Sequence, residues 1–183
     1  MLAGIAVADI TPPLGVAMDG YGSRTKGAEA IEEPLQAQCL VLSEADSPED
    51  GVALLCLDLG NLDISTREAI RRRAASEAGL PPQRLIISVS HTHFAPIVDP
   101  PGWLAPSMRE LVSADYREKL VATASKLVSE AWDSRAAARV LHGSWLAPGI
   151  SFNRRPLAPD GTCAQRFRLP ETAAAAASWE GYA

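Results

Sequence analysis

The chain has 183 residues, of which 47% are hydrophobic and 21% are charged, and its formal net charge is −5. These values are ordinary for a globular protein, and the length suits a single domain with room for a hydrophobic core. The largest cluster of basic side chains, residues 71–73, lies in a helical pattern among acidic residues. The electrostatic footprint of a nucleic-acid-binding protein is therefore missing.

No apolar run in the sequence approaches the length of a transmembrane segment. Residues 1–9 lack the basic region and the long apolar core of a signal peptide, so we expect a cytoplasmic location by default. The three cysteines, Cys39, Cys56 and Cys163, follow no metal-binding spacing and form no even disulfide set. Cys39 and Cys56 stand in apolar runs and are interpreted as small buried residues.

The first half of the chain predicts three short strands, at residues 4–10, 38–43 and 52–59. A glycine-rich loop at residues 15–27 separates the first two strands, and by itself it is typical of a flexible connector. The polar turn at residues 47–51 joins the second and third strands as a hairpin. Residues 52–57 are apolar at every position, which favours a central strand that is covered on both faces.

The second half predicts helices at residues 66–78 and 113–133 and strands at residues 84–89 and 138–146. A capping box, with Ser65 as the N-cap and Glu68 reaching back to it, begins the first helix, and Gly79 ends it. The apolar positions of the second helix should face the core: Tyr116, Leu120, Ala124, Leu127, Val128 and Ala131. His142, in the last predicted strand, is interpreted as structural.

This order of elements predicts an α/β fold, a mixed sheet with flanking helices. We expect residues 1–170 to form one partial domain and residues 171–183, which include five consecutive alanines, to form an unpatterned tail. A chain that ends in mid-domain would have this pattern.

The most informative segment follows the strand at residues 84–89, where His91 and His93 are separated by a single threonine. In an extended segment the two rings would point to the same side. Imidazole is a common metal ligand and the commonest general acid or base at neutral pH. The alternative is a pair of histidines bonded to backbone groups at the end of a strand.

Two other segments could contribute to a site at this sheet edge. The proline-rich, apolar residues 96–106 are either a lid or wall for an apolar substrate, or a loop that packs over the core. Asn153, Arg154 and Arg155 follow the last predicted strand, where an arginine could stabilise developing negative charge; by themselves they are typical of a solvated loop.

Together these motifs resemble the N-terminal part of the neutral/alkaline, non-lysosomal ceramidase family. The resemblance covers residues 3 to about 160 in family order. His-Thr-His is its most specific part. Four segments carry it: residues 8–13 with the Gly-Tyr-Gly-Ser-Arg at 20–24, residues 56–60, residues 88–93 and residues 153–156.

The resemblance implies a zinc amidase that cleaves the N-acyl bond of ceramide and therefore takes a lipid-like N-acyl substrate. By the matched motifs, His91 is a zinc ligand, and His93 assists the attacking water or the tetrahedral intermediate. Arg154 helps to hold that intermediate or the polar head of the substrate. Asn153, Tyr21 and Arg24 are the implied substrate-binding residues.

The chain also departs from the family pattern. Arg155 stands where the family has a serine, and the family's other zinc ligands, a histidine, a glutamate and a tyrosine, come after the loop at residues 153–156. We therefore expect a truncated chain that is inactive alone. The alternatives are a degenerate homologue that acts as a non-catalytic binding module, a partner chain that supplies the missing ligands, or a plain structural domain. The oligomeric state is left open.

Overall fold

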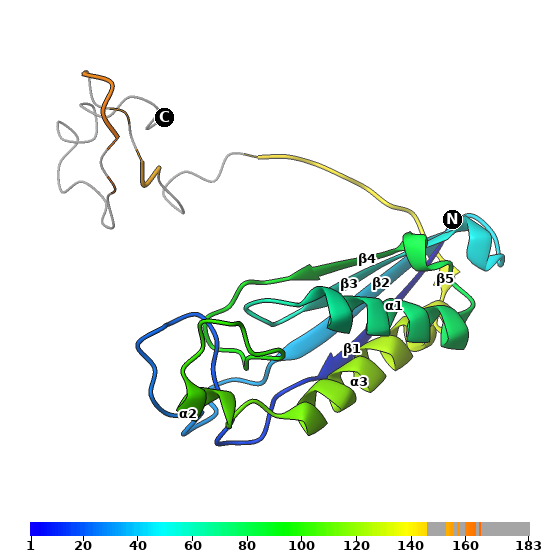
Figure 1. The fold of residues 1–183 in the computed structure, drawn as a ribbon. Helices are drawn as coiled ribbons and strands as arrows, with labels where there is room; N and C mark the ends of the chain where they lie inside the picture. Colours follow the sequence, from blue (N-terminus) through cyan, green and yellow to red (C-terminus); the bar gives the residue numbers. More distant parts are fainter. Residues whose placement is uncertain (146–152, 156, 158–159, 164, 166–183) are drawn as a thin grey trace. The chain divides into compact units, whose positions relative to one another are not determined.

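The computed structural model describes residues 1–145, 153–155, 157, 160–163 and 165. The chain divides into two units, Met1–Arg139 and a second unit that begins at Val140, and each is described by itself (Figure 1). The predicted tail at residues 171–183 lies outside the described residues, and the boundary at residue 170 stays a prediction.

The first unit is a mixed sheet with helices, so the predicted α/β class is confirmed. The sheet has the strand order β4-β3-β2-β1-β5, and its pairs are antiparallel except for β3 and β4, which are parallel. Its strands are β1 (Leu2–Asp9), β2 (Gln36–Ser43), β3 (Gly51–Leu57), β4 (Leu85–Val89) and β5 (Ala136–Ala137). The helices are α1 (Ile64–Ala78), α2 (Pro106–Arg109) and α3 (Ala114–Asp133), with short 3-10 turns η1 (Pro48–Asp50) and η2 (Pro82–Arg84).

The predicted hairpin is confirmed, because β2 and β3 pair antiparallel from Ala37–Leu57 to Ser43–Gly51. The parallel pair β3 and β4 needs a crossover connection, and α1 provides it. Both strands of a parallel pair end at the same edge of the sheet. Segments that follow β3 and β4 therefore meet at that edge.

The two long helices lie against one face of the sheet (Figure 1). In β3, Ala53, Leu55 and Leu57 are fully buried under them, whereas Val52 and Leu54 are half-buried and Cys56 is exposed. The prediction that β3 is covered on both faces is therefore wrong for the part of the chain that is described, and so is the prediction that Cys56 is buried. Cys39 is buried as predicted, and burial raises the pKa of its thiol to about 12.

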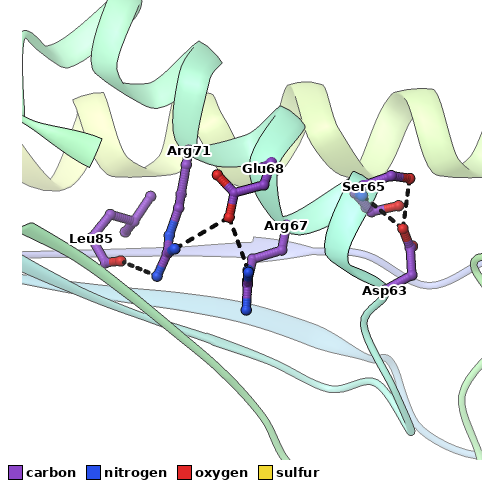
Figure 2. A network of polar contacts seen from close by, with 7 residues as sticks. Asp63, Ser65, Arg67, Glu68, Arg71 and Leu85 are labelled. Carbon is purple, nitrogen blue, oxygen red and sulfur yellow. Dashed lines mark hydrogen bonds and ion pairs between the residues drawn. The ribbon is translucent and has the colours of Figure 1, made fainter. Parts of the chain in front are cut away.

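Helix α1 ends as predicted but begins differently. Gly79 adopts the left-handed conformation with φ 68°, which glycine allows without a steric cost. The N-cap is Asp63, whose Oδ1 accepts from the Thr66 backbone N–H at 2.8 Å, so the prediction of Ser65 as the cap is wrong. Ser65 instead donates to Asp63 at 2.6 Å, and Glu68 pairs with two arginines of its own helix (Figure 2).

Helix α3 matches its prediction closely. Ser113 caps it by accepting from the Tyr116 N–H, and each residue predicted for the core face is buried. The Tyr116 hydroxyl donates to the carbonyl of Ile10 at 2.7 Å, which joins the helix to the end of β1. None of the helices in the described ranges is long and apolar enough to cross a membrane.

The strand predicted at residues 138–146 does not form within its described part, residues 138–145. Pairing with β1 stops at Leu2–Ala137, and the last backbone bond runs from Ala138 N–H to Met1 O. The segment then passes Leu2, the first residue of β1, and residues 138–145 belong to no strand. His142 is consequently exposed instead of lying in a sheet.

Candidate active site at the histidine pair

His91 lies just after β4 in an unusual backbone conformation. Its φ is 59°, and it is the one non-glycine residue with a positive φ among those described. Its ring Nδ1 lies 2.7 Å from the carbonyl oxygen of Gly60, which follows the neighbouring strand β3. A carbonyl only accepts hydrogen bonds, so Nδ1 carries a proton, and in the neutral ring the lone pair is on Nε2.

His93 lies beside His91 as predicted, although not for the predicted reason. The two ring centroids are 5.2 Å apart with an interplanar angle of 79°. Because β4 ends at Val89 and His91 is left-handed, a turn in the backbone, and not strand alternation, brings the rings together. The other side of His93 meets the Tyr21 ring edge-on, at a centroid distance of 4.9 Å.

The glycine-rich loop at residues 15–27 packs against this pair and is therefore more than a connector. A Cβ at Gly20 would lie 2.3 Å from Cγ of His93, so the loop backbone approaches the ring closely. Arg24 donates to the backbone carbonyls of Asp19 and His93, the latter at 2.8 Å. Its guanidinium also lies over the Tyr21 ring, 4.8 Å from the centroid.

Sequence reasoning missed two polar residues of this region, Asp19 and Asn61. The Asp19 carboxylate accepts from the Asn61 side chain at 2.8 Å and from the Gly20 N–H at 2.7 Å. Only their positions in the sequence could have indicated a role at the site: Asp19 directly precedes the Gly-Tyr-Gly motif, and Asn61 closely follows the end of a strand. Their bond joins the glycine-rich loop to the segment after β3.

A cavity of about 910 Å³ is lined by the residues on either side of His93, although neither histidine lines it. Its walls come from the loop at residues 23–35 and from Thr92 and Phe94, the two neighbours of His93. The volume lies in the range of small-molecule sites. Its wall combines apolar side chains such as Met18, Ile31 and Leu35 with charged ones of both signs: Arg24, Lys26, Glu29, Glu32, Glu33 and Asp58.

The proline-rich residues 96–106 divide into two parts. Ile97 and Val98 are buried, so the beginning of the segment packs onto the first unit. Trp103 is 69% exposed and lines a small hollow of about 100 Å³ together with Tyr21, Met108 and others. The packing alternative is therefore confirmed for the start of the segment, and the lid or wall for an apolar substrate stays a prediction.

Asn153 and Arg154 belong to the second unit. Both are exposed, and the Asn153 side chain accepts from the Arg155 N–H at 2.9 Å, which forms a tight local turn. Of the six predicted site residues, the structure thus brings His91, His93, Tyr21 and Arg24 together in the first unit. Across the described part of the chain, no three His, Cys, Asp or Glu side chains are grouped so that they could hold a metal ion.

Comparison with known proteins places this fold. No protein-family model and no curated protein matches the chain. It is similar to the crystal structure of neutral ceramidase from Pseudomonas aeruginosa, with 20% identity and a TM-score of 0.63 over 73% of this chain and 22% of that chain. A structure of ceramidase complexed with C2 is similar as well, with 22% identity and a TM-score of 0.57 over 73% of this chain and 21% of that chain.

The fold is that of part of a neutral ceramidase. The family resemblance read from the motifs is therefore confirmed at the level of the fold. The chain spans about a fifth of the length of the two ceramidases it matches.

Proposed function

We propose that this chain is part of a zinc-dependent amide hydrolase of the ceramidase type, which cleaves an N-acyl lipid into a sphingoid amine and a fatty acid. One observation carries the proposal: His91 presents a free Nε2 beside His93 at a strand edge, next to a cavity of about 910 Å³. The ceramidase fold supports the substrate class.

His91 fits the role of a zinc ligand. Metal-binding histidines usually donate their other ring N–H to a carbonyl or carboxylate, which fixes the tautomer and the ring orientation. The bond between Nδ1 and the Gly60 carbonyl supplies this support. Zinc, when bound, polarises an amide carbonyl and lowers the pKa of water to roughly 7.

His93 is proposed as the catalytic acid or base. Its ring is half-buried between His91 and Tyr21, and its neighbours Thr92 and Phe94 line the cavity in which the acyl chain would lie. It would take a proton from the attacking water and pass one to the departing amine. Tyr21 and Arg24 are proposed to contact the substrate from the glycine-rich loop. Asn153 and Arg154 belong to the second unit. The roles that the resemblance implies for them, substrate binding for Asn153 and holding the intermediate or the polar head for Arg154, stay predictions.

A second candidate function is a non-catalytic binding module. A catalytic zinc ordinarily needs three protein ligands, and the described residues contain no group of three metal-binding side chains. A chain of this kind could retain the cavity and bind an N-acyl lipid without cleaving it. Metal binding and turnover distinguish the two candidates.

The first test is zinc binding by the metal-free chain. We expect zinc, titrated by isothermal calorimetry, to bind at about one ion per chain. His91→Ala should abolish this binding, because it removes the Nε2 lone pair. His142→Ala is the matched control and should bind like the wild type, since His142 is exposed and lies outside the site. Unchanged binding by His91→Ala would refute the assignment.

The second part of the test is fatty-acid release from a short-chain ceramide in the presence of zinc. If the wild-type chain hydrolyses the lipid, His93→Ala and Arg154→Ala should each reduce turnover by about 100-fold or more while zinc content stays the same. Equal turnover would remove the substituted residue from the site. A wild-type chain that binds the lipid, binds no zinc and does not hydrolyse the lipid would establish the binding module instead.

A further inference from the structure

Arg24 occupies a junction between the two loops that form the site. Its guanidinium donates to the backbone carbonyls of Asp19 and His93, residues that are 74 positions apart in the numbering and belong to different loops. The same group lies 4.8 Å from the Tyr21 ring centroid and 5.8 Å from that of Phe94. Arg24 is thus held by two carbonyls and two aromatic rings at once.

These contacts form one connected chain that reaches both histidines. Arg24 binds the carbonyl of His93, and Tyr21, stacked under Arg24, meets the ring of His93 edge-on. On the other side, the Asp19 carboxylate binds Asn61, and Gly60, the neighbour of Asn61, holds the ring of His91. The relative orientation of the two imidazoles therefore depends on how the loop at residues 19–24 is docked.

The chemistry of the contacts requires arginine. A planar guanidinium can donate in two directions in its own plane and stack on aromatic faces at the same time. A lysine ammonium at this position would keep the charge but would lack the rigid fork and the flat face. The partners of Arg24 are uncharged backbone carbonyls, so its contacts are directional hydrogen bonds and not an ion pair.

We propose that Arg24 is a positioning residue that holds the backbone and ring of His93 in register with His91. This inference deepens the proposed function and rests on it for its kinetic consequences. The structural part, the control of His93 by Arg24, stands independently of whether the chain hydrolyses anything.

The structural part is tested by nuclear magnetic resonance of the imidazole Cε1–H groups in the metal-free chain. The chain has three histidines, so the spectrum has three signals, which the alanine variants of His91, His93 and His142 assign. In the wild type, the ring current of Tyr21 should displace the His93 signal from the position of the exposed His142. Arg24→Gln and Arg24→Lys should both lose most of this displacement, whereas the His91 signal, fixed by Gly60, should move less.

The matched control is Arg73→Gln on α1, which makes the same change of charge on the surface. Arg73 pairs with Glu77 at 2.7 Å and touches none of the residues discussed above. Its three histidine signals should equal those of the wild type. An unchanged His93 signal in Arg24→Gln would overturn the proposal. Unfolding of both Arg24 variants, seen by circular dichroism, would also overturn it, because Arg24 would then support the fold in general.

The kinetic part uses the short-chain ceramide assay. A misplaced catalytic group costs on the order of 100-fold in rate, so Arg24→Lys should lower kcat by about this factor with little change in zinc content. A raised KM with unchanged kcat would show that Arg24 acts only by binding substrate, and would overturn the positioning role. If the wild type shows no hydrolysis, as expected for a truncated chain that is inactive alone, zinc binding still tests the proposed function and the resonance experiment still decides the role of Arg24.

Discussion

At the scale of single residues, the site depends on backbone shapes that few side chains allow. Gly20 has a φ of 96° and approaches the ring of His93 so closely that a Cβ would lie 2.3 Å from Cγ. Two separate physical reasons, the positive φ and the lack of space, therefore require glycine at this position. Gly22, two residues later, meets neither condition, since a Cβ there would have nothing within 4 Å.

We accordingly predict that Gly20→Ala is destabilising and Gly22→Ala is not. Gly20→Ala should lower the free energy of unfolding by about 1–3 kcal/mol, because it combines backbone strain with a clash. Gly22→Ala should stay within about 0.5 kcal/mol of the wild type. Urea unfolding measures both values. Equal stabilities for the two variants would mean that the loop is not docked against His93.

At the scale of elements, the start of α1 shows how a local motif can be overridden. The sequence from Ser65 to Glu68 satisfies the capping box, yet Asp63 caps the helix. The Ser65 hydroxyl accepts from Arg117 of α3 at 2.9 Å, so its oxygen bonds to another helix and does not cap α1. Glu68 binds Arg71, and Arg71 reaches the carbonyl of Leu85 at 3.2 Å, which ties α1 to β4 (Figure 2).

The charge state of Asp63 gives this cap a pH dependence. Burial raises the pKa of Asp63, but hydrogen bonds from Ser65 and Thr66 and the nearby Arg117 outweigh burial and bring the pKa below its ordinary value of 3.8. A carboxyl whose pKa is lower in the folded state stabilises the fold above pH 3.8. This stability is lost as the pH falls through the folded-state pKa.

We therefore predict that Asp63→Ala lowers the free energy of unfolding by about 1 kcal/mol at pH 7. The difference from the wild type should shrink as the pH falls below 3.8 and through the lower folded-state pKa of the carboxyl. Asp63→Asn, which keeps an oxygen acceptor, is the control and should lose less at pH 7. Urea unfolding at pH 7 and at a pH below 3.8 provides the measurement. A difference that does not change with pH would contradict the role of the charge.

At the scale of the whole unit, the sheet is covered on one face by α1 and α3 (Figure 1). The pattern of β3 predicts burial on both faces, because its inner and outer residues are both apolar. Within the described residues, Leu55 is fully buried, and its neighbour Cys56 is exposed on the other face. The two positions thus report on the two faces of the same strand.

Leu55→Ala should cost about 2–5 kcal/mol of unfolding free energy, the usual cost of a cavity in a close-packed core. Cys56→Ala should change it by less than about 0.5 kcal/mol. Thermal and urea unfolding of both variants compare the faces directly. A Cys56→Ala variant as unstable as Leu55→Ala would show that the outer face is buried in solution.

Much of the fold was predictable because its signals are local. The periodicity of α3, the glycine that ends α1 and the turn between β2 and β3 each depend on residues a few positions apart. The strand predicted at residues 138–146 is wrong for its described part, because an edge strand also needs a partner and its pairing with β1 stops at Ala137. For the site, the spacing of His91 and His93 was informative, while Asp19 and Asn61 carried no recognisable motif.

The sequence by itself determined the α/β class, the order of the long elements from β1 to α3 and the position of the histidine pair after a strand end. Tertiary structure alone decided which nitrogen of His91 is free, how Arg24 docks one loop on the other, and which face of the sheet is buried. The physical reason is distance along the chain. The bonds from His91 to Gly60 and from Arg24 to His93 span 31 and 69 residues, far beyond the reach of any helical or strand periodicity.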